Sequence, residues 1–592
     1  MMPFLILSWP AQCVRSGNAA AKLRASVRSR QPQWRLLLDE PGRLVAVGSS
    51  GPFVAGRCRG EPTFLIGDLF SRGARAIEEL PGAARSFADL CHLLRDDFWG
   101  AYIAVQLGEP YAWSIFRDPV GMRDAIGWSH GNLWIFASEA AEWLMLAPPA
   151  DLAIDGDRIA ELLFSSSTVA EATPLTGIET LAPGALIEFG DGKRTARRLW
   201  EPRQFYGGHA RHGLADELIR TTTMCIDTWL TAYPKPFIEI SGGFDSAVVA
   251  AVATRTQHKF EMGINFFVED LAGDERRFAR DLAVRHAIAL HEIFLPVGRL
   301  SEADLDGMPV GVRPGIGSTT LVHDRLLAEL AAAKRARTLV TGHGGDAIFF
   351  QHPTPMIAAD PSFPRTRLQA YRDLAQWSKS SVWTVARHAW RGGFEPASRG
   401  DSAPTSLPLA AGTRRKSSAW AGNLEGLPPA KTLQIRAIAG DRSAFGPSWR
   451  SQALTVLHPL LSQPLVEVAI SIDSFELTAG RRDRALARDI FHGILPASIV
   501  ERRGKGALGA FFGRMLAASG PFLRAYLLDG QLVRHGILDR AALEIMLDRD
   551  QLMRVDCYGA VFSALVTEHW IRVWLERLDA IRQNYNETPA LP

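Results

Sequence analysis

Cysteine, lysine and long apolar runs are all scarce in this chain of 592 residues. Its cysteines number five, and no two of them have the spacing of zinc ligands or of a redox pair. So sparse a set favours a reducing, cytoplasmic location. No stretch approaches 18 uninterrupted apolar residues, and a membrane span is therefore not expected. The cysteines are Cys13, Cys58, Cys91, Cys225 and Cys557.

An excess of one charge sign is also missing. The chain has 66 Lys and Arg against 63 Asp and Glu, which gives a formal net charge of +3. Only nine of the basic residues are lysines. Such a balance gives no broad cationic field, so we expect no nucleic-acid partner. The length and a hydrophobic content of 47% predict more than one globular domain and exclude disorder of the whole chain.

The first two hundred residues are rich in short runs typical of strands. Residues 1–7 are apolar without basic residues, and Trp9-Pro10 ends them early, which predicts a first strand rather than a signal peptide. A polar stretch, Glu201–Gly213, is the expected linker. The other expected strands are Trp34–Asp39, Leu44–Val47, Thr63–Ile66, Ala101–Leu107, Ala112–Phe116 and Leu133–Ala137.

After the linker, strands alternate with helices, which predicts a parallel sheet that binds ligands at its carboxyl edge. From His352 the pattern is mainly helical, and Gly392–Pro429 is expected to be a mobile or partly disordered loop. The expected strands are Pro236–Ile240, Phe260–Val268, Leu290–Leu295 and Thr338–Thr341, and the helices between them are Ser246–Thr254, Asp274–His286 and Thr320–Ala333.

The segment Ser241-Gly242-Gly243-Phe244-Asp245-Ser246 lies between an expected strand and an expected helix. Two glycines let the backbone approach an anion, and a helix N-terminus supplies unpaired N–H groups. Asp245 could hold the magnesium that accompanies a triphosphate. The alternative is a glycine-rich turn without a ligand. A Walker-type loop is absent, because neither Gly192-Lys193 nor Gly504-Lys505 is followed by Ser or Thr.

This loop resembles the pyrophosphate loop of AMP-forming ligases, and the chain is similar to asparagine synthetases over most of its length. Residues 340–346 resemble the second signature of that family, with His343 between two glycines. The other similar segments are Arg117–Gly121, Phe136–Glu139, His458–Leu461, Leu465–Glu467, Arg484–Arg488, Leu495-Pro496 and Arg503–Gly506.

The resemblance implies an α+β and α/β fold: an N-terminal Ntn-hydrolase-like (class II glutaminase) domain over 1–205, then an adenine nucleotide alpha hydrolase-like synthetase domain with a parallel sheet over 206–592. An insertion of helices and loops is expected at about 352–452. The implied cofactors are ATP and Mg²⁺, with Asp245 and Asp346 as metal ligands and Lys505 neutralising phosphate charge. The implied ATP-binding residues are Ser241, Gly242, Gly243, Asp245, Ser246, Gly342 and Gly344.

The chain departs from the family at its glutaminase residues. The nucleophilic cysteine is expected at the mature N-terminus, where this chain has Met2, and the oxyanion-stabilising Asn is replaced by Ile66. Cys13 is the nearest cysteine, and we expect it to be buried or inert. These changes predict an inactive glutaminase-like domain, retained as a packing partner.

Without ammonia from glutamine, the amine must come from elsewhere, as in the β-lactam synthetases and lasso-peptide cyclases of this family. A histidine, with a reference pKa of about 6.5, suits deprotonation of an amine near neutral pH, so His343 is a candidate base. We therefore expect a lasso-peptide cyclase acting on a precursor core peptide, with a leader peptidase and a leader-binding protein as partners. The alternatives are a β-lactam synthetase-like ligase of a small amino acid and a non-catalytic scaffold.

Each of these residues also has a simpler interpretation. His343 could only hydrogen-bond ATP or a carbonyl group, Asp346 could be a helix N-cap, and Lys505 could be solvated. Asp270, Asp274 and Glu275 are expected to form a solvated helix start. Trp377, Trp383 and Trp390 have near-helical spacing and are expected to pack in a core or groove.

Overall fold

The structure is a computed structural model. It describes residues 3–30, 32–49, 51–82, 84–138, 141–165, 170–207, 213–270, 273–315, 321–391, 407–409, 418–502, 504, 506 and 508–586. Within these ranges, none of the helices combines the length and the apolar character that crossing a membrane requires.

The N-terminal part, residues 4–198, is a sandwich of two six-stranded antiparallel sheets. In spatial order the first sheet contains β10 (Ile178–Thr180), β8 (Ile126–His130), β9 (Leu133–Ala137), β1 (Phe4–Ser8), β3 (Arg43–Gly48) and β2 (Trp34–Glu40). The second contains β12 (Lys193–Arg198), β11 (Ala185–Gly190), β7 (Ala112–Arg117), β6 (Phe98–Gly108), β5 (Glu61–Ser71) and β4 (Phe53–Cys58).

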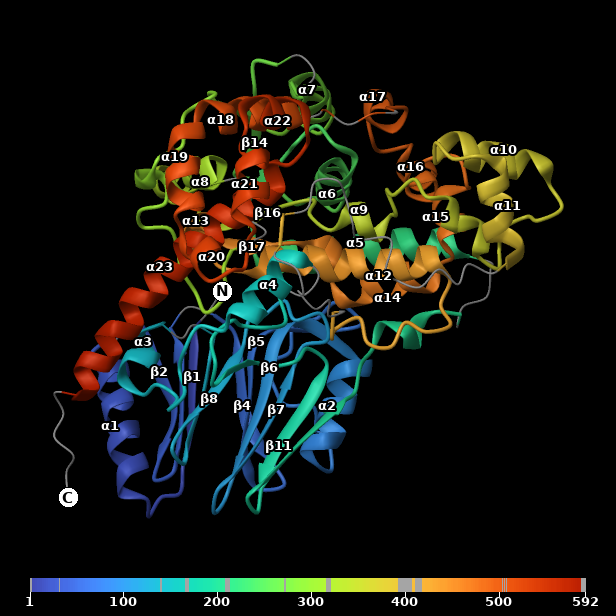
Figure 1. The fold of residues 1–592 in the computed structure, drawn as a ribbon. Coiled ribbons are helices and arrows are strands. Elements are labelled where there is room, and N and C mark those ends of the chain that lie inside the picture. The colour runs from blue at the N-terminus through green and yellow to red at the C-terminus, as the bar shows by residue number, and fades with distance from the viewer. Residues whose placement is uncertain are drawn as a thin grey trace.

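Alternation of side chains along the strands builds this sandwich. Phe4 and Ile6 of β1 lie with Ile66 and Ile103 of the second sheet in one buried cluster between the sheets. Residues of opposite parity face outward and are covered by helices, α1 (Val14–Arg28) on the first sheet and α2 (Phe87–Asp96) on the second. Figure 1 shows this four-layer arrangement, with α1 and α2 on opposite outer sides. Two shorter helices, α3 (Ala141–Leu146) and α4 (Gly156–Phe164), complete this part.

The C-terminal part contains a five-stranded parallel sheet in the order β15-β14-β13-β16-β17. The strands that follow β13 are added first on one side, as β14 and β15, and then on the other side, as β16 and β17. The direction of strand addition thus switches at β13, and such a switch point opens a crevice at the carboxyl edge. The strands are β13 (Phe237–Glu239), β14 (Met262–Phe267), β15 (Leu290–Phe294), β16 (Thr338–Val340) and β17 (Thr455–Leu457).

Helices cover both faces of this sheet, one in the buried cluster of Phe237 and Leu339 and the other in that of Ile238 and Val340. Those in the first half are α5 (Leu214–Ala232), α6 (Phe244–Arg255), α7 (Arg276–Arg285), α8 (Leu321–Lys334), α9 (Gly345–Ile348), α10 (Leu368–Trp377), α11 (Val382–Arg391), α12 (Pro429–Asp441) and α13 (Trp449–Ala453). The rest are α14 (Gln463–Ser471), α15 (Ser474–Thr478), α16 (Ala485–Phe491), α17 (Ala497–Val500), α18 (Gly509–Ala518), α19 (Gly520–Leu528), α20 (Gln531–Arg534), α21 (Arg540–Met546), α22 (Arg549–Arg554) and α23 (Tyr558–Asn586). Short 3-10 turns are η2 (Pro202–Phe205), η3 (Glu302–Asp304), η4 (Pro355–Ala359), η5 (Arg442–Phe445) and η6 (Pro459–Leu461).

The fold class expected from the sequence is confirmed, and every expected strand is present. The sequence missed β17, because three residues in a helical region give too short a signal. In the sandwich it also missed strands that are short or that contain glycine or charged residues, namely β4, β8, β10, β11 and β12. The expectation of a mobile loop over 392–429 is wrong for its last part. Trp420 is buried, and its indole N–H donates to the Pro119 carbonyl at 2.8 Å. Residues 392–406 and 410–417, like part of the expected linker, lie outside the described residues.

The tryptophan expectation is also partly wrong. Trp377 is half-buried against the core, but Trp383 and Trp390 on α11 are 84% and 72% exposed. The buried face of α11 uses Val385 and Ala389 instead. Both exposed indoles lie on the solvent side of a strongly amphipathic helix, which near-helical spacing alone does not reveal.

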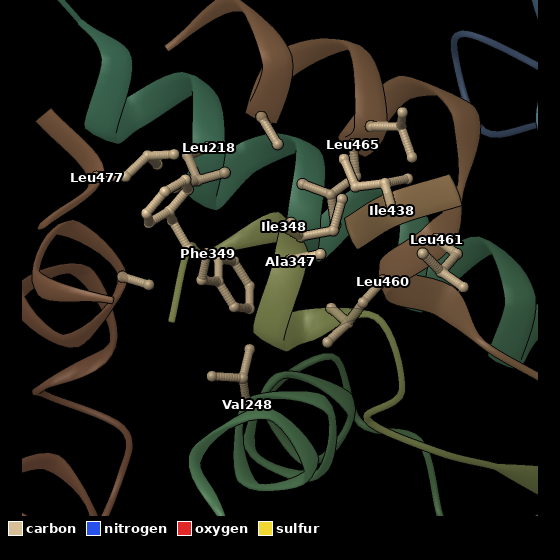
Figure 2. Packing of buried hydrophobic residues seen from close by; sticks show 14 of the residues in the cluster. Leu218, Val248, Ala347, Ile348, Phe349, Ile438, Leu460, Leu461, Leu465 and Leu477 are labelled. Atoms are coloured by element: carbon tan, nitrogen blue, oxygen red, sulfur yellow. The ribbon is translucent and has the colours of Figure 1, made fainter. Parts of the chain in front are cut away.

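An apolar core surrounds the short helix α9 and fixes the turn that precedes it. Figure 2 shows Leu218 of α5, Val248 of α6 and Ile438 of α12 converging on Ala347, Ile348 and Phe349. Ala347 and Ile348 are buried with exposures of 1% and 0%. Because α9 is packed on several sides, the polar residues just before it are held at the carboxyl edge of the sheet.

Candidate active site

A cavity of about 830 Å³ lies at the carboxyl edge of the parallel sheet. It is lined by the segments after β13 and β16, by η5, and by Arg484 and Arg488 near α16. The N-terminal sandwich supplies part of the wall through Arg117, Gly121 and Asp124. Both parts of the chain therefore contribute to one cavity, at the place where the strand order predicts a ligand site.

The Ser241–Ser246 loop joins β13 to the N-terminus of α6. Gly242 has a φ of +81°, and a Cβ there would lie 2.7 Å from the Glu275 carbonyl oxygen, so only glycine fits. The Ser241 and Ser246 hydroxyls lie 3.1 Å apart, and the Gly243 N–H donates to the Ser241 hydroxyl at 3.3 Å. The loop thus presents backbone N–H groups and two hydroxyls beside the positive end of α6, a favourable environment for an anion.

The second glycine-rich turn, after β16, packs directly on this loop. A Cβ on Gly342 would lie 2.3 Å from the Ser246 nitrogen, and one on Gly344 would lie 2.5 Å from Leu461 Cγ. Every residue expected from the sequence to bind ATP borders the cavity except Gly242, which packs against Glu275 instead. Tertiary structure therefore brings the two signatures, 100 residues apart in the chain, into one wall.

Asp245 and Asp346, the two expected metal ligands, are joined by Arg484. The Arg484 guanidinium donates to both Asp245 carboxylate oxygens at 2.9 and 2.8 Å and also to an Asp346 oxygen. It bonds Gln351 and Asp483 as well, each at 2.8 Å. Asp346 lies in the first turn of α9, whose N-cap is Gly344, so the simple N-cap interpretation of Asp346 is wrong.

Burial raises the pKa of Asp245 to about 6, and the nearby Asp346 adds to this, whereas Arg484 opposes it. The same two carboxylates raise the pKa of Arg484 above its ordinary value, against the opposing effect of burial. The cation that the two acids share in the structure is the Arg484 guanidinium.

These residues fit a magnesium ion that is shared with a triphosphate. Mg²⁺ prefers hard oxygen ligands and usually takes one or two carboxylates together with phosphates and waters. Asp245 and Asp346 offer two such groups beside the anion-binding loop. No group of three or more His, Cys, Asp or Glu suited to a metal is present in the described ranges, so phosphate oxygens would have to complete the coordination.

His343 lies between the two glycines of the second turn and borders the cavity. Its Nε2 is 2.9 Å from the Asp441 carbonyl oxygen. A carbonyl can only accept, so the neutral ring carries its proton on Nε2 and leaves the Nδ1 lone pair available. The Asp441 carboxylate is 4.0 Å from the same Nε2.

The rings of His458 and His343 meet edge to face, with their centres 5.2 Å apart. Burial lowers the pKa of His458 well below its ordinary value, so this ring stays neutral. His458 Nδ1 and the Thr341 hydroxyl lie 2.7 Å apart, and that hydroxyl oxygen accepts from the backbone N–H of His343 at 3.1 Å. The backbone of His343 is thereby fixed.

Lys505 lies outside the described residues, as do Arg503 and Ala507. The neighbouring residues Arg502 and Gly504 border the cavity. Arg502 donates to the Gly242 carbonyl at 3.2 Å and to Glu275 at 2.5 Å, and the Gly506 N–H also donates to Glu275 at 2.5 Å. The expectation that Glu275 is solvated is wrong, because its carboxylate ties this segment to the phosphate loop.

In the N-terminal sandwich, Ile66, which stands at the expected oxyanion position, and the nearby Asp68 are both buried. Ile66 is fully buried between the sheets and has no polar side chain to offer. The Asp68 carboxylate accepts from the hydroxyl of Tyr233, the C-cap residue of α5, at 2.9 and 3.0 Å. Burial raises the pKa of Asp68. Cys13 caps α1 and is half-buried, beyond the opposite end of β1 from Phe4.

Sequence reasoning missed the roles of Arg484, Glu275 and Asp441. Arg484 belongs to a segment that resembles the family, which was a usable signal, but its pairing with Asp245 depends on a contact across 239 residues. Glu275 stands in a charged run and Asp441 at the end of a helix, so neither position stands out in the sequence.

Together, the four-layer sandwich and the parallel sheet with its glycine-rich loop define an α+β part followed by an α/β part. The family model described as asparagine synthase matches residues 236–572, more than half of the chain. The chain belongs to the asparagine synthase family. Membership implies an ATP-dependent amide ligase that forms AMP and pyrophosphate.

Comparison with other proteins adds little beyond the family. No match is found among curated proteins. A solved allosteric regulatory enzyme of purine biosynthesis is similar at 11% identity, covering 51% of this chain and 82% of that one with a TM-score of 0.21. Glutamine phosphoribosylpyrophosphate amidotransferase from B. subtilis, solved with ADP and GMP, gives 10% identity, 67% and 94% coverage, and the same TM-score of 0.21.

Proposed function

We propose that this protein is a lasso-peptide cyclase: an ATP-dependent, AMP-forming ligase that joins an Asp or Glu side chain of a precursor peptide to the peptide's own N-terminal amine. The observation that carries the proposal is His343, which borders the same cavity as the anion-binding loop and whose Nε2 is bonded to the Asp441 carbonyl. The location proposed for this enzyme is the cytoplasm.

The first step activates the carboxylate. A side-chain carboxylate oxygen of the peptide attacks the α-phosphorus of ATP, the bond to the bridging oxygen breaks, and pyrophosphate leaves. Ser241, Ser246 and the Gly243 N–H would bind the departing pyrophosphate at the N-terminus of α6. Asp245 and Asp346 would hold the Mg²⁺ that neutralises phosphate charge, and Lys505 would stabilise charge at the α-phosphate.

The second step closes the ring. The peptide's N-terminal amine attacks the acyl carbon, and AMP leaves. His343 would accept the amine proton at Nδ1, because Nε2 keeps its proton in the hydrogen bond to the Asp441 carbonyl. The Asp441 carboxylate, 4.0 Å away, then stabilises the imidazolium. Both reacting groups belong to one peptide, so proximity replaces a high concentration of amine.

The amine is proposed to come from the peptide because the glutaminase-like region lacks the means to supply ammonia. Ile66 offers no hydrogen-bond donor where an oxyanion would need one, and Tyr233 covers Asp68. We propose that this region, residues 1–205, is catalytically inactive and acts as a wall and packing partner of the synthetase region, 206–592. The Arg442 guanidinium supports this role, since it is buried and donates to the Val120 carbonyl at 2.6 Å.

A β-lactam synthetase-like ligase of a small amino acid is the second candidate. The extent of the cavity favours the peptide: it reaches from Trp377 of α10 to Arg117 of the sandwich, with a volume of about 830 Å³. A leader peptidase and a leader-binding protein would deliver the peptide in this scheme.

Mass spectrometry tests the proposal. Candidate precursor peptides, freed of their leader segments, are incubated with the protein, Mg²⁺ and ATP. The expected product has lost 18 Da, the mass of one water, resists Edman degradation at its N-terminus, and appears with one AMP per ring. A product formed from a small amino acid alone, with no peptide converted, would favour the second candidate.

A further inference from the structure

The helical hairpin of α10 and α11 carries an exposed aromatic stripe. Trp383, Arg387 and Trp390 follow one another at intervals of four and three residues, so they share one face of α11. The Trp383 and Trp390 indoles are 84% and 72% exposed, whereas most other tryptophans of the chain are buried. Leaving two indoles in water forfeits their large burial energy, and such patches commonly mark interaction surfaces.

The surroundings of this stripe are basic. Residues 365–391 contain six Lys or Arg and a single acidic residue, Asp373, a net charge of +5, whereas the whole chain has +3. The side chains of Arg367, Arg372, Lys379 and Arg387 are exposed. Asp373 accepts from Gln369 at 2.7 Å. Charge complementarity therefore points to an acidic occupant.

The combination of Trp and Arg favours a peptide over a membrane or a nucleic acid. These two residue types supply much of the binding energy in protein interfaces. A membrane-binding helix needs a broad apolar face, but the apolar face of α11, with Val385 and Ala389, is buried in the protein. A single-strand binder needs a groove that follows the backbone, and neither exposed indole borders the cavity.

The hairpin also adjoins the cavity. Trp377, the last residue of α10, lines the cavity, and Trp383 follows six residues later on α11. Six residues span at most about 22 Å, so a peptide that leaves the cavity past Trp377 passes within that distance of the start of the stripe. We infer that Trp383, Arg387 and Trp390 form a docking surface for an acidic segment of the substrate peptide outside its reacting end. The docking surface itself does not depend on the proposed function. The assignment of the acidic segment to the substrate peptide, rather than to another protein, rests on it.

Fluorescence anisotropy tests the surface without catalysis. The probe is a fluorescein-labelled 15-residue peptide of Glu, Leu and Gly, and a peptide with Lys in place of Glu is its charge control. Trp383→Ser combined with Trp390→Ser should weaken binding of the acidic probe by about 10-fold or more. The matched control is Val284→Ser on α7, which removes an 83% exposed side chain elsewhere and should change nothing.

Three results would overturn the docking surface: equal affinity of the double variant and the unaltered protein, equal binding of the Lys peptide, or no binding of the acidic probe. Trp-dependent binding of phosphatidylglycerol vesicles or of a 12-nucleotide oligouridylate, with none of the acidic peptide, would assign the stripe to a membrane or a nucleic acid instead.

Kinetics tests the source of the segment. Peptides with and without an acidic tail are compared as substrates for AMP formation. The double variant should raise KM for the tailed peptide by about 10-fold at unchanged kcat and leave the tail-free peptide unaffected. An unchanged KM for the tailed peptide would overturn the substrate as source. If no peptide supports AMP formation while Trp-dependent binding persists, the proposed function fails and the docking surface stands.

Discussion

Two regions of this molecule have a carboxylate close to a glycine, but only one of them leaves the carboxylate open to a cavity. At Ile66–Asp68 of the sandwich, the carboxylate is buried, and Tyr233, which directly follows α5, donates to it. At Ser241–Asp346 of the synthetase region, the carboxylates of Asp245 and Asp346 face a cavity of about 830 Å³ and share one guanidinium. A polar group that another element covers becomes part of the packing, whereas one that faces a cavity stays available to a ligand.

The largest effect is expected from Asp245→Asn, which keeps the size of the side chain but removes its charge. Peptide-dependent pyrophosphate release should fall by about 10³-fold, the upper range for loss of one electrostatic stabiliser. The assay follows pyrophosphate with saturating Mg²⁺ and ATP, and a melting curve controls for folding. Products of ADP and phosphate in the unaltered protein would contradict the reaction class.

Lys505→Ala should lower product formation by about 10²-fold or more, because a cation at the α-phosphate acts in both half-reactions. Lys22→Ala, which removes an exposed lysine of α1 outside the cavity lining, is the matched control for pyrophosphate–ATP exchange. Exchange at an undiminished rate in Lys505→Ala would remove Lys505 from the first step.

His343→Ala should separate the two half-reactions. Peptide-dependent pyrophosphate–ATP exchange should persist, while ring formation falls by about 10²-fold, because a base acts only when the amine attacks. The deficit should shrink as pH rises past the reference pKa of an α-amine, about 7.7–8.0, since more of the amine is then already neutral. A parallel fall of both activities without recovery at high pH would place His343 in the nucleotide pocket only.

A smaller effect is expected where the sandwich meets α5. Tyr233→Phe removes the hydroxyl that donates to buried Asp68 and should lower the free energy of unfolding by about 1–3 kcal/mol. Tyr111→Phe, which removes a hydroxyl bonded to the Asn132 carbonyl at 2.6 Å near the surface, should cost less. Equal melting temperatures for the Tyr233 variant and the unaltered protein would mean that water replaces the lost donor.

Cys13→Ala is expected to leave glutamine hydrolysis unchanged, at zero. The purified protein should release no glutamate from glutamine, because Ile66 provides no donor for an oxyanion and Cys13 lies beyond the far end of β1. Glutamate release that disappears in Cys13→Ala would reverse the comparison and make the sandwich an active glutaminase.

The sequence by itself determined the alternation of strands and helices from β13 to β16 and both glycine-rich turns, since hydrophobic period, Gly φ preferences and motif spacing are local properties. Residues 241–246 and 342–346 were identified because their signals lie within a few residues of one another. Only the tertiary structure decided what these turns contact. Arg484 joins Asp245 to Asp346, Glu275 holds Arg502 near the loop, and Tyr233 closes Asp68. Each contact links residues that are distant in the chain, and their partners depend on packing, which no local pattern records.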